Sequence, residues 1–149
     1  MAGVGFFMSA AEMALVGTTA KTIIEITAAA NHRAIFEQFG FFFDGAVVTN
    51  EPVVVELIRI GTTGTGTAGT AVKALPDDPE TLQTTFKYNM TVEPTGVTVL
   101  KRWNIHPQTG YETILPITRP YELPGGDLVG IRCTAPDAVN VLVNIEGYE

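Results

Sequence analysis

The sequence predicts an all-β protein folded as an antiparallel β-sandwich with a jelly-roll-like order of strands. Thr, Val and Ile make up 46 of its 149 residues, and these β-branched residues favour strands over helices. Fifteen glycines and nine prolines divide the chain into short segments, with turn signals about every 8–12 residues, the spacing typical of sandwiches and barrels. The length is that of one domain with one hydrophobic core.

The first twenty residues are predicted to be an arm that is separate from a single sandwich domain at residues 21–149. The arm carries one charge, Glu12, and no basic residue precedes its apolar part. A secretory signal requires positive charge there, so we expect the arm to remain in the mature protein. The arm is either extended or a short helix over residues 9–16, with Ser9 as its N-cap and Glu12 three residues later.

The apolar side chains of this arm predict contact with a partner, because exposed pairs of phenylalanine lower solubility unless another surface covers them. Packing of the arm on its own domain and disorder are the two alternatives. Deletion of residues 1–16 is accordingly expected to weaken partner binding and to leave the sandwich folded. The side chains expected at this contact are Phe6, Phe7, Met8 and Met13.

In the first half of the body, apolar runs alternate with turn residues. Residues 21–28 and 52–61 are predicted strands, rich in isoleucine and valine. Residues 33–44 contain five phenylalanines. The helical spacing of their first apolar positions makes a helix over residues 28–39 the alternative, whereas the consecutive phenylalanines at 41–43 favour a strand that is covered on both faces.

The second half is predicted to be strands throughout. Residues 84–92 and 97–105 are expected to pair as a hairpin through the four-residue loop 93–96. Two further strands, at residues 111–117 and 127–134, each follow a turn that contains glycine. The clearest alternation of apolar and polar positions is that of Val139, Val141, Val143 and Ile145.

The composition argues against several function classes. The net charge is −7 and the chain has no basic cluster, which is unfavourable for gripping phosphate backbones. No apolar run approaches the roughly 20 residues that span a bilayer. The single cysteine, Cys133, excludes a disulfide within the chain and a site built from several thiolates. We therefore predict no nucleic-acid partner and no membrane partner.

No recognisable constellation of catalytic residues is present. Ser9 and Cys133 have no histidine near them in the sequence to act as a base, and His32 and His106 lack the close spacing of a metal-binding pair. The acidic residues at 77–80 can supply oxygen ligands to calcium, but such a run is more often a solvated loop. We predict a protein that is not an enzyme and holds no cofactor or metal; a hydrolase with an unrecognised carboxylate pair is the alternative.

The Gly/Thr-rich segment at residues 61–71 contains the pattern G-x-G-x-x-G. A dinucleotide site also needs a helix after this pattern, and the prolines at 76 and 79 leave no room for one. The segment is therefore predicted to be a flexible, uncharged loop whose backbone can contact a neighbour. The residues expected at that contact are Thr63, Thr65 and Thr67.

Five stretches carry a family resemblance. They are FFFDG (41–45), PVVVELIRIGTTGTGT (52–67), TVEPTG (91–96), RWNIHPQTGYE (102–112) and PGGDLVGIRCTAPDAVNVLVNIEGYE (124–149). Together they resemble small β-sandwich virion proteins of tailed bacteriophages, which form capsid decoration (cement) or minor capsid components.

The resemblance implies a structural role in the virion. We expect the protein to bind the outer surface of the shell formed by the major capsid protein, to stabilise that shell, and to form a homotrimer. Its expected location is the capsid exterior, after synthesis in the host cytoplasm. The alternative is a head-fibre or tail-associated module that binds host glycan through the aromatic side chains of Trp103 and Tyr111.

Overall fold

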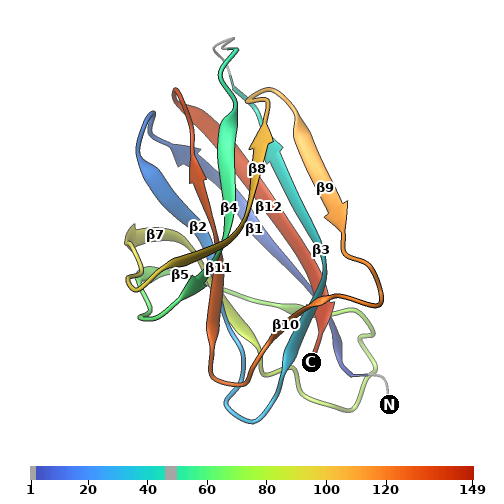
Figure 1. Ribbon diagram of the computed structural model, residues 1–149. Helices are drawn as coiled ribbons and strands as arrows, with labels where there is room; N and C mark the ends of the chain where they lie inside the picture. Colours follow the sequence, from blue (N-terminus) through green and yellow to red (C-terminus); the bar gives the residue numbers. More distant parts are fainter. Residues whose placement is uncertain (1–2, 46–49) are drawn as a thin grey trace.

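The computed structural model describes residues 3–45 and 50–149, and it consists of two antiparallel β-sheets packed face to face (Figure 1). The predicted antiparallel β-sandwich is confirmed. The described residues contain no helix, and accordingly none of them forms a helix that could span a membrane.

The strands fall into two six-stranded sheets. Sheet A comprises β1 (Gly5–Leu15), β3 (Ala34–Phe43), β6 (Val72–Lys73), β9 (Gly110–Ile114), β10 (Tyr121–Leu123) and β12 (Val139–Tyr148). Its order is β10-β3-β12-β1-β6, and β9 also pairs with β3. Sheet B comprises β2 (Ala20–Thr27), β4 (Val53–Ile60), β5 (Thr65–Gly69), β7 (Thr85–Val92), β8 (Thr98–Ile105) and β11 (Leu128–Thr134). Its order is β5-β7-β2-β11-β4-β8.

The strands pair in a nested way. In sheet A, β1 pairs with β12, β12 with β3, and β3 with β9. In sheet B, β2 pairs with β11, β11 with β4, and β4 with β8. This nested order is the jelly-roll arrangement that the sequence predicts. The strands β5 and β7 extend sheet B beyond β2, and β6 extends sheet A beyond β1.

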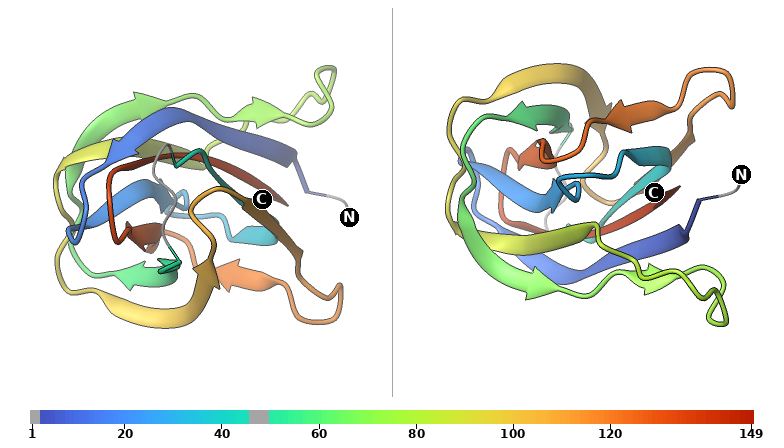
Figure 2. Two further views of the ribbon diagram at one scale, coloured as in Figure 1. Left: turned by 90° about the horizontal axis from the view of Figure 1, so that it is seen from above. Right: turned by 90° about the horizontal axis from the view of Figure 1, so that it is seen from below.

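Alternate side chains of both sheets fill the core, which the strands surround when the sandwich is viewed from above or below (Figure 2). Along β12, buried positions alternate with half-buried ones from end to end. A group of aromatic rings occupies the centre: the Phe36 ring lies 5.9 Å from that of Phe6 and 6.0 Å from those of Phe39 and Tyr121, measured between centroids. These contacts connect β1, β3 and β10 within the core.

The predicted arm is wrong: residues 5–15 form neither an arm nor a helix, but the strand β1 inside sheet A. Phe6, Met8 and Met13 are buried in the chain's own core, at 1%, 1% and 4% exposure. They therefore pack on their own domain, the alternative to partner contact. Only Phe7 of the four predicted contact residues faces outward, at 45% exposure. Residues 1–2 of the predicted arm lie outside the described residues.

Three other local expectations also fail. The helical alternative for residues 28–39 fails because β3 begins at residue 34 and pairs with β12 along its length. Within β3, Phe41 and Phe43 are buried, but Phe42 points outward and is 38% exposed, so this strand is not covered on both faces. The predicted hairpin is absent too, because β7 pairs with β2 whereas β8 pairs with β4.

The Gly/Thr-rich segment is an ordered part of sheet B rather than a flexible loop. Residues 65–69 form β5, which pairs with β7. Its glycines are required by close packing: a Cβ atom at Gly66 would lie 2.5 Å from the sulfur of Met90, and one at Gly69 would lie 2.1 Å from the Phe86 ring. Glycine allows β5 to lie directly on these two side chains.

Candidate functional site

The outer face of sheet A carries two pairs of apolar side chains, one near each end of the sheet's long strands. Phe7 of β1 lies opposite Val72 of β6, and both are largely exposed, at 45% and 60%. Further along the same face, Leu142 of β12 lies opposite Phe42 of β3. The Phe42 ring lies directly over Gly110 of β9, where a Cβ atom would come within 2.2 Å of it. Exposed apolar side chains on ordered, paired strands are typical of a contact surface.

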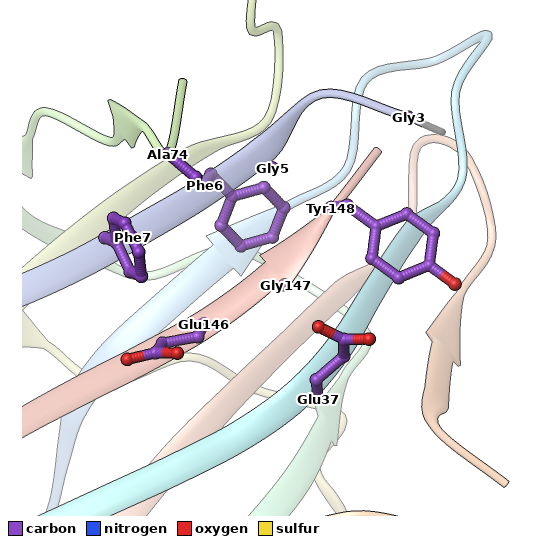
Figure 3. Close-up of a pocket in the computed structure, with 9 residues that line it drawn as sticks. All are labelled: Gly3, Gly5, Phe6, Phe7, Glu37, Ala74, Glu146, Gly147 and Tyr148. Carbon is purple, nitrogen blue, oxygen red and sulfur yellow. The ribbon is translucent and has the colours of Figure 1, made fainter. Parts of the chain in front are cut away.

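A groove of about 320 Å³ opens in this face at the ends of β1 and β12 (Figure 3). Two glycines line its floor: Gly5, which pairs with Tyr148, and Gly147, which pairs with Phe6. A Cβ atom at Gly147 would lie 2.1 Å from the carbonyl oxygen of Ile35, so the backbone there tolerates only glycine. The residues that line the groove are Gly3, Gly5, Phe6, Phe7, Glu37, Ala74, Glu146, Gly147 and Tyr148.

The groove is acidic. Glu146 lies opposite Phe7 across the β1–β12 pair, and Glu37 is the extra residue where the register between β3 and β12 shifts. In Figure 3, Glu146 lies on the Phe7 side of the groove and Glu37 on the Tyr148 side. Neither carboxylate takes part in the ion pairs found among the described residues.

The two sheets carry opposite charge. Apart from tyrosine, the ionisable side chains on the strands of sheet A are five glutamates and one lysine: Glu12, Glu37, Glu112, Glu122, Glu146 and Lys73. Those on the strands of sheet B, tyrosine and cysteine aside, are six basic residues and two glutamates: Lys21, Arg59, Lys87, Lys101, Arg102, Arg132, Glu25 and Glu56. Such an asymmetry sets the orientation in which a protein approaches any charged surface.

The two carboxylates of sheet B are both satisfied within the chain. Arg102 and Arg132 donate hydrogen bonds of 2.8 and 2.7 Å to Glu56. Burial by itself raises the pKa of Glu56, but these hydrogen bonds and the charges of the two arginines outweigh it and hold the pKa below its ordinary value. Glu25 is buried and accepts hydrogen bonds from the Thr63 hydroxyl and, at 3.0 Å, from the Gly64 amide.

The structure brings Trp103 and Tyr111 together. Both line a second cavity, of about 390 Å³, which His106 and Gly110 also line. Trp103 is half-buried: its ring lies 5.3 Å from that of Phe41, and the Lys101 ammonium lies 5.4 Å from its centroid. Tyr111 is more exposed, at 44%. An open aromatic pair of this kind fits the stacking surface that a sugar ring requires.

The three predicted threonine contacts lie on or next to strand β5, and all three are exposed. Thr63 donates its hydroxyl to Glu25 and so has a role within the fold. Thr65 and Thr67 are exposed on β5, an edge strand of sheet B. They therefore lie on a different sheet from Phe7.

The remaining reactive candidates have structural roles. Cys133 is buried; burial, and then the charge of Glu56, raise the pKa of its thiol, so the reactive thiolate is disfavoured. His106 accepts a hydrogen bond from the amide of Gln108 in a turn. Asp78 accepts a hydrogen bond from the amide of Glu80. No group of three or more His, Cys, Asp or Glu side chains in the described ranges is placed to hold a metal ion.

Comparison of the chain with protein-family models, with curated proteins and with solved structures finds no match. Its function is therefore inferred from the surfaces themselves. Glu37, Glu146 and Tyr148 are the site residues that sequence reasoning missed. The alternation of residues 139–148 carries a signal for two of them, because it places Glu146 and Tyr148 on the face opposite the buried valines.

Proposed function

We propose that this protein is a non-enzymatic decoration protein of a bacteriophage capsid, and that it binds the outer surface of the major capsid protein through the outer face of sheet A. The observation that carries the proposal is the exposed pair of Phe7 and Val72 beside the groove, on two paired strands. The family resemblance of residues 21–149 supports it and implies a homotrimer as the binding unit. Its location is the capsid exterior.

A contact of this size is weak on its own and becomes strong when several linked copies bind together. Burying several hundred Å² of apolar surface contributes several kcal/mol, at ~25 cal/mol per Å². The loss of rotational and translational freedom offsets much of this gain for one isolated contact. Linking three copies makes the second and third contacts intramolecular, and the avidity of the trimer then exceeds that of each contact.

Shell adsorption of the purified protein tests the proposal. We expect the wild-type protein to cosediment with empty capsids of the phage that encodes it. Substitution Val72→Ser should weaken this binding about tenfold, because roughly 1.5 kcal/mol of valine burial is lost at the contact. Val92→Ser is the matched control, since Val92 is similarly exposed, at 58%, but lies on β7 of sheet B. Absence of adsorption, or an equal loss for both variants, would contradict the proposal.

The cavity shared by Trp103 and Tyr111 favours glycan binding by a head-fibre or tail-associated module as a second candidate. For this candidate, we expect a glycan array to show reproducible sugar binding. We expect Tyr111→Ala to weaken that binding about tenfold, because it removes one stacking surface. Tyr111 is the better probe because Trp103 also contacts Phe41 in the core. Tyr148→Ala is the control: it also removes a partly exposed aromatic side chain, but Tyr148 does not line this cavity, so sugar binding should stay intact. An array without binding eliminates this candidate.

A further inference from the structure

The groove at the ends of β1 and β12 has the shape of a slot for one extended side chain. Its floor lacks a side chain at Gly5, which lies on the outer face opposite Tyr148. Gly147 contributes only its backbone, because a side chain there would point into the core, toward Phe6 and the Ile35 carbonyl oxygen. Phe7 and Tyr148 stand on either side of this floor (Figure 3). A long, unbranched side chain can therefore lie between two aromatic rings.

The charge of the groove indicates which chemical group that side chain should carry at its tip. Glu37 and Glu146 line it, and neither is neutralised by an ion pair within the described part of the chain. By contrast, Glu25, Glu56 and Glu122 each have a basic partner. Lys73, on the adjoining strand β6, donates its ammonium to the carbonyl oxygen of Asp78 at 2.9 Å. The groove therefore presents uncompensated negative charge beside aromatic faces, and both attract a cation.

We infer that this groove binds a single lysine or arginine side chain of the partner protein. The inference rests on the proposed function and names the chemistry by which sheet A recognises the capsid surface. The aliphatic stem of the partner residue packs between Phe7 and Tyr148. Its cationic head lies near Glu37 and Glu146, where charge-assisted hydrogen bonds are stronger than neutral ones.

Shell adsorption at several salt concentrations tests the inference with the full-length protein. The double variant Glu37→Gln/Glu146→Gln keeps the shape of the groove and removes its charge. We expect it to bind empty capsids about tenfold more weakly than the wild type at low salt, with a smaller loss of affinity as salt is raised, because an ion pair is screened by salt. Glu12→Gln is the matched control: Glu12 is exposed on β1 of the same sheet and does not line the groove.

Three outcomes of this experiment separate the two claims. If the wild type does not adsorb, the proposed function is wrong. If the wild type and the double variant adsorb equally, with equal salt dependence, the proposed function stands and the inference is wrong. If the double variant instead changes the sedimentation coefficient of the free protein, the groove is occupied by a second copy of the chain, and the inference is again wrong.

A titration without capsids examines the groove directly. N-acetyl-arginine amide, followed by ¹H–¹⁵N NMR, should give saturable shifts at the amides of residues 5–7 and 146–148 in the wild type. The uncharged isostere N-acetyl-citrulline amide should give none at the same concentrations, and the double variant should lose the response to the arginine compound. Equal responses to the two compounds, or no saturable response to either, would overturn the inference even if capsid binding is observed.

Discussion

Deletion of residues 1–16 is expected to abolish folding of the sandwich. The deleted segment contains β1, which lies between β12 and β6 inside sheet A. Burying one large apolar side chain contributes about 1.5–3 kcal/mol, so losing four of them approaches the whole stability of a typical domain, about 5–15 kcal/mol. These four buried side chains are Phe6, Met8, Met13 and Leu15. The structure therefore reverses the prediction from the sequence alone, in which the sandwich stays folded without these residues.

Circular dichroism and thermal unfolding measure this effect, and two adjacent phenylalanines provide a matched pair of point variants. Phe6→Ser should destabilise the protein by about 3–5 kcal/mol, because Phe6 is 1% exposed and packs against Phe36. Phe7→Ser should change stability by less than about 0.5 kcal/mol, because Phe7 faces solvent. A truncated protein that still unfolds cooperatively at the wild-type temperature would show that β1 is dispensable.

Glu25→Ala is expected to lower the free energy of unfolding by about 3 kcal/mol. Glu25 is 1% exposed on β2, and its carboxylate binds the Thr63 hydroxyl and the Gly64 amide. The Lys87 ammonium lies 3.7 Å from it and completes the network. Removing the carboxylate leaves the buried Gly64 amide without its acceptor and Lys87 without its counter-charge. It also releases the segment that carries the chain from β4 to β5.

Denaturant unfolding of three variants resolves the contributions to this effect. Glu25→Gln keeps the size of the side chain and one acceptor oxygen, so its loss should fall between that of Glu25→Ala and zero. Glu80→Ala replaces an exposed glutamate and should cost less than about 0.5 kcal/mol. If Glu25→Ala is as mild as Glu80→Ala, the network does not hold the crossover in place.

The strands that the sequence predicted well are those with an unbroken two-residue period. The alternation over residues 139–145 appears unchanged in β12. In β1 the same period runs through Phe6, Met8 and Ala10, and then a shift in register against β12 moves it to Met13 and Leu15. That shift hides the alternation from sequence reading, and the segment resembles an arm for this reason.

Sheet neighbours were harder to predict than strands, because they depend on contacts far apart in the chain. The loop at residues 93–96 has the turn residues of a hairpin, yet it connects strands that lie on different sides of sheet B. Its Thr95 pairs instead with Thr62, in the other connection that crosses the same sheet. The turn residues there predict a hairpin, whereas contacts across the whole core decide which strand each of the two strands pairs with.

The sequence likewise predicts only part of the candidate site. Phe7, Trp103 and Tyr111 were found because aromatic residues are conspicuous in a sequence. Glu37 and Glu146 were not, because they are 109 positions apart and become neighbours only when β3 pairs with β12. Their lack of an ion partner is visible only once every basic side chain of the described residues has been placed.

The pairing of β1 with β12 has a consequence for biosynthesis. The amide of Val4 donates to the carbonyl oxygen of Glu149, and the amide of Glu149 donates back to Val4. The apolar strand β1 therefore emerges from the ribosome long before β12, the strand that pairs with it, has been translated. The core of the sandwich can close only after β12 has been translated, and such dependence on distant contacts makes folding slow and leaves the nascent protein open to aggregation.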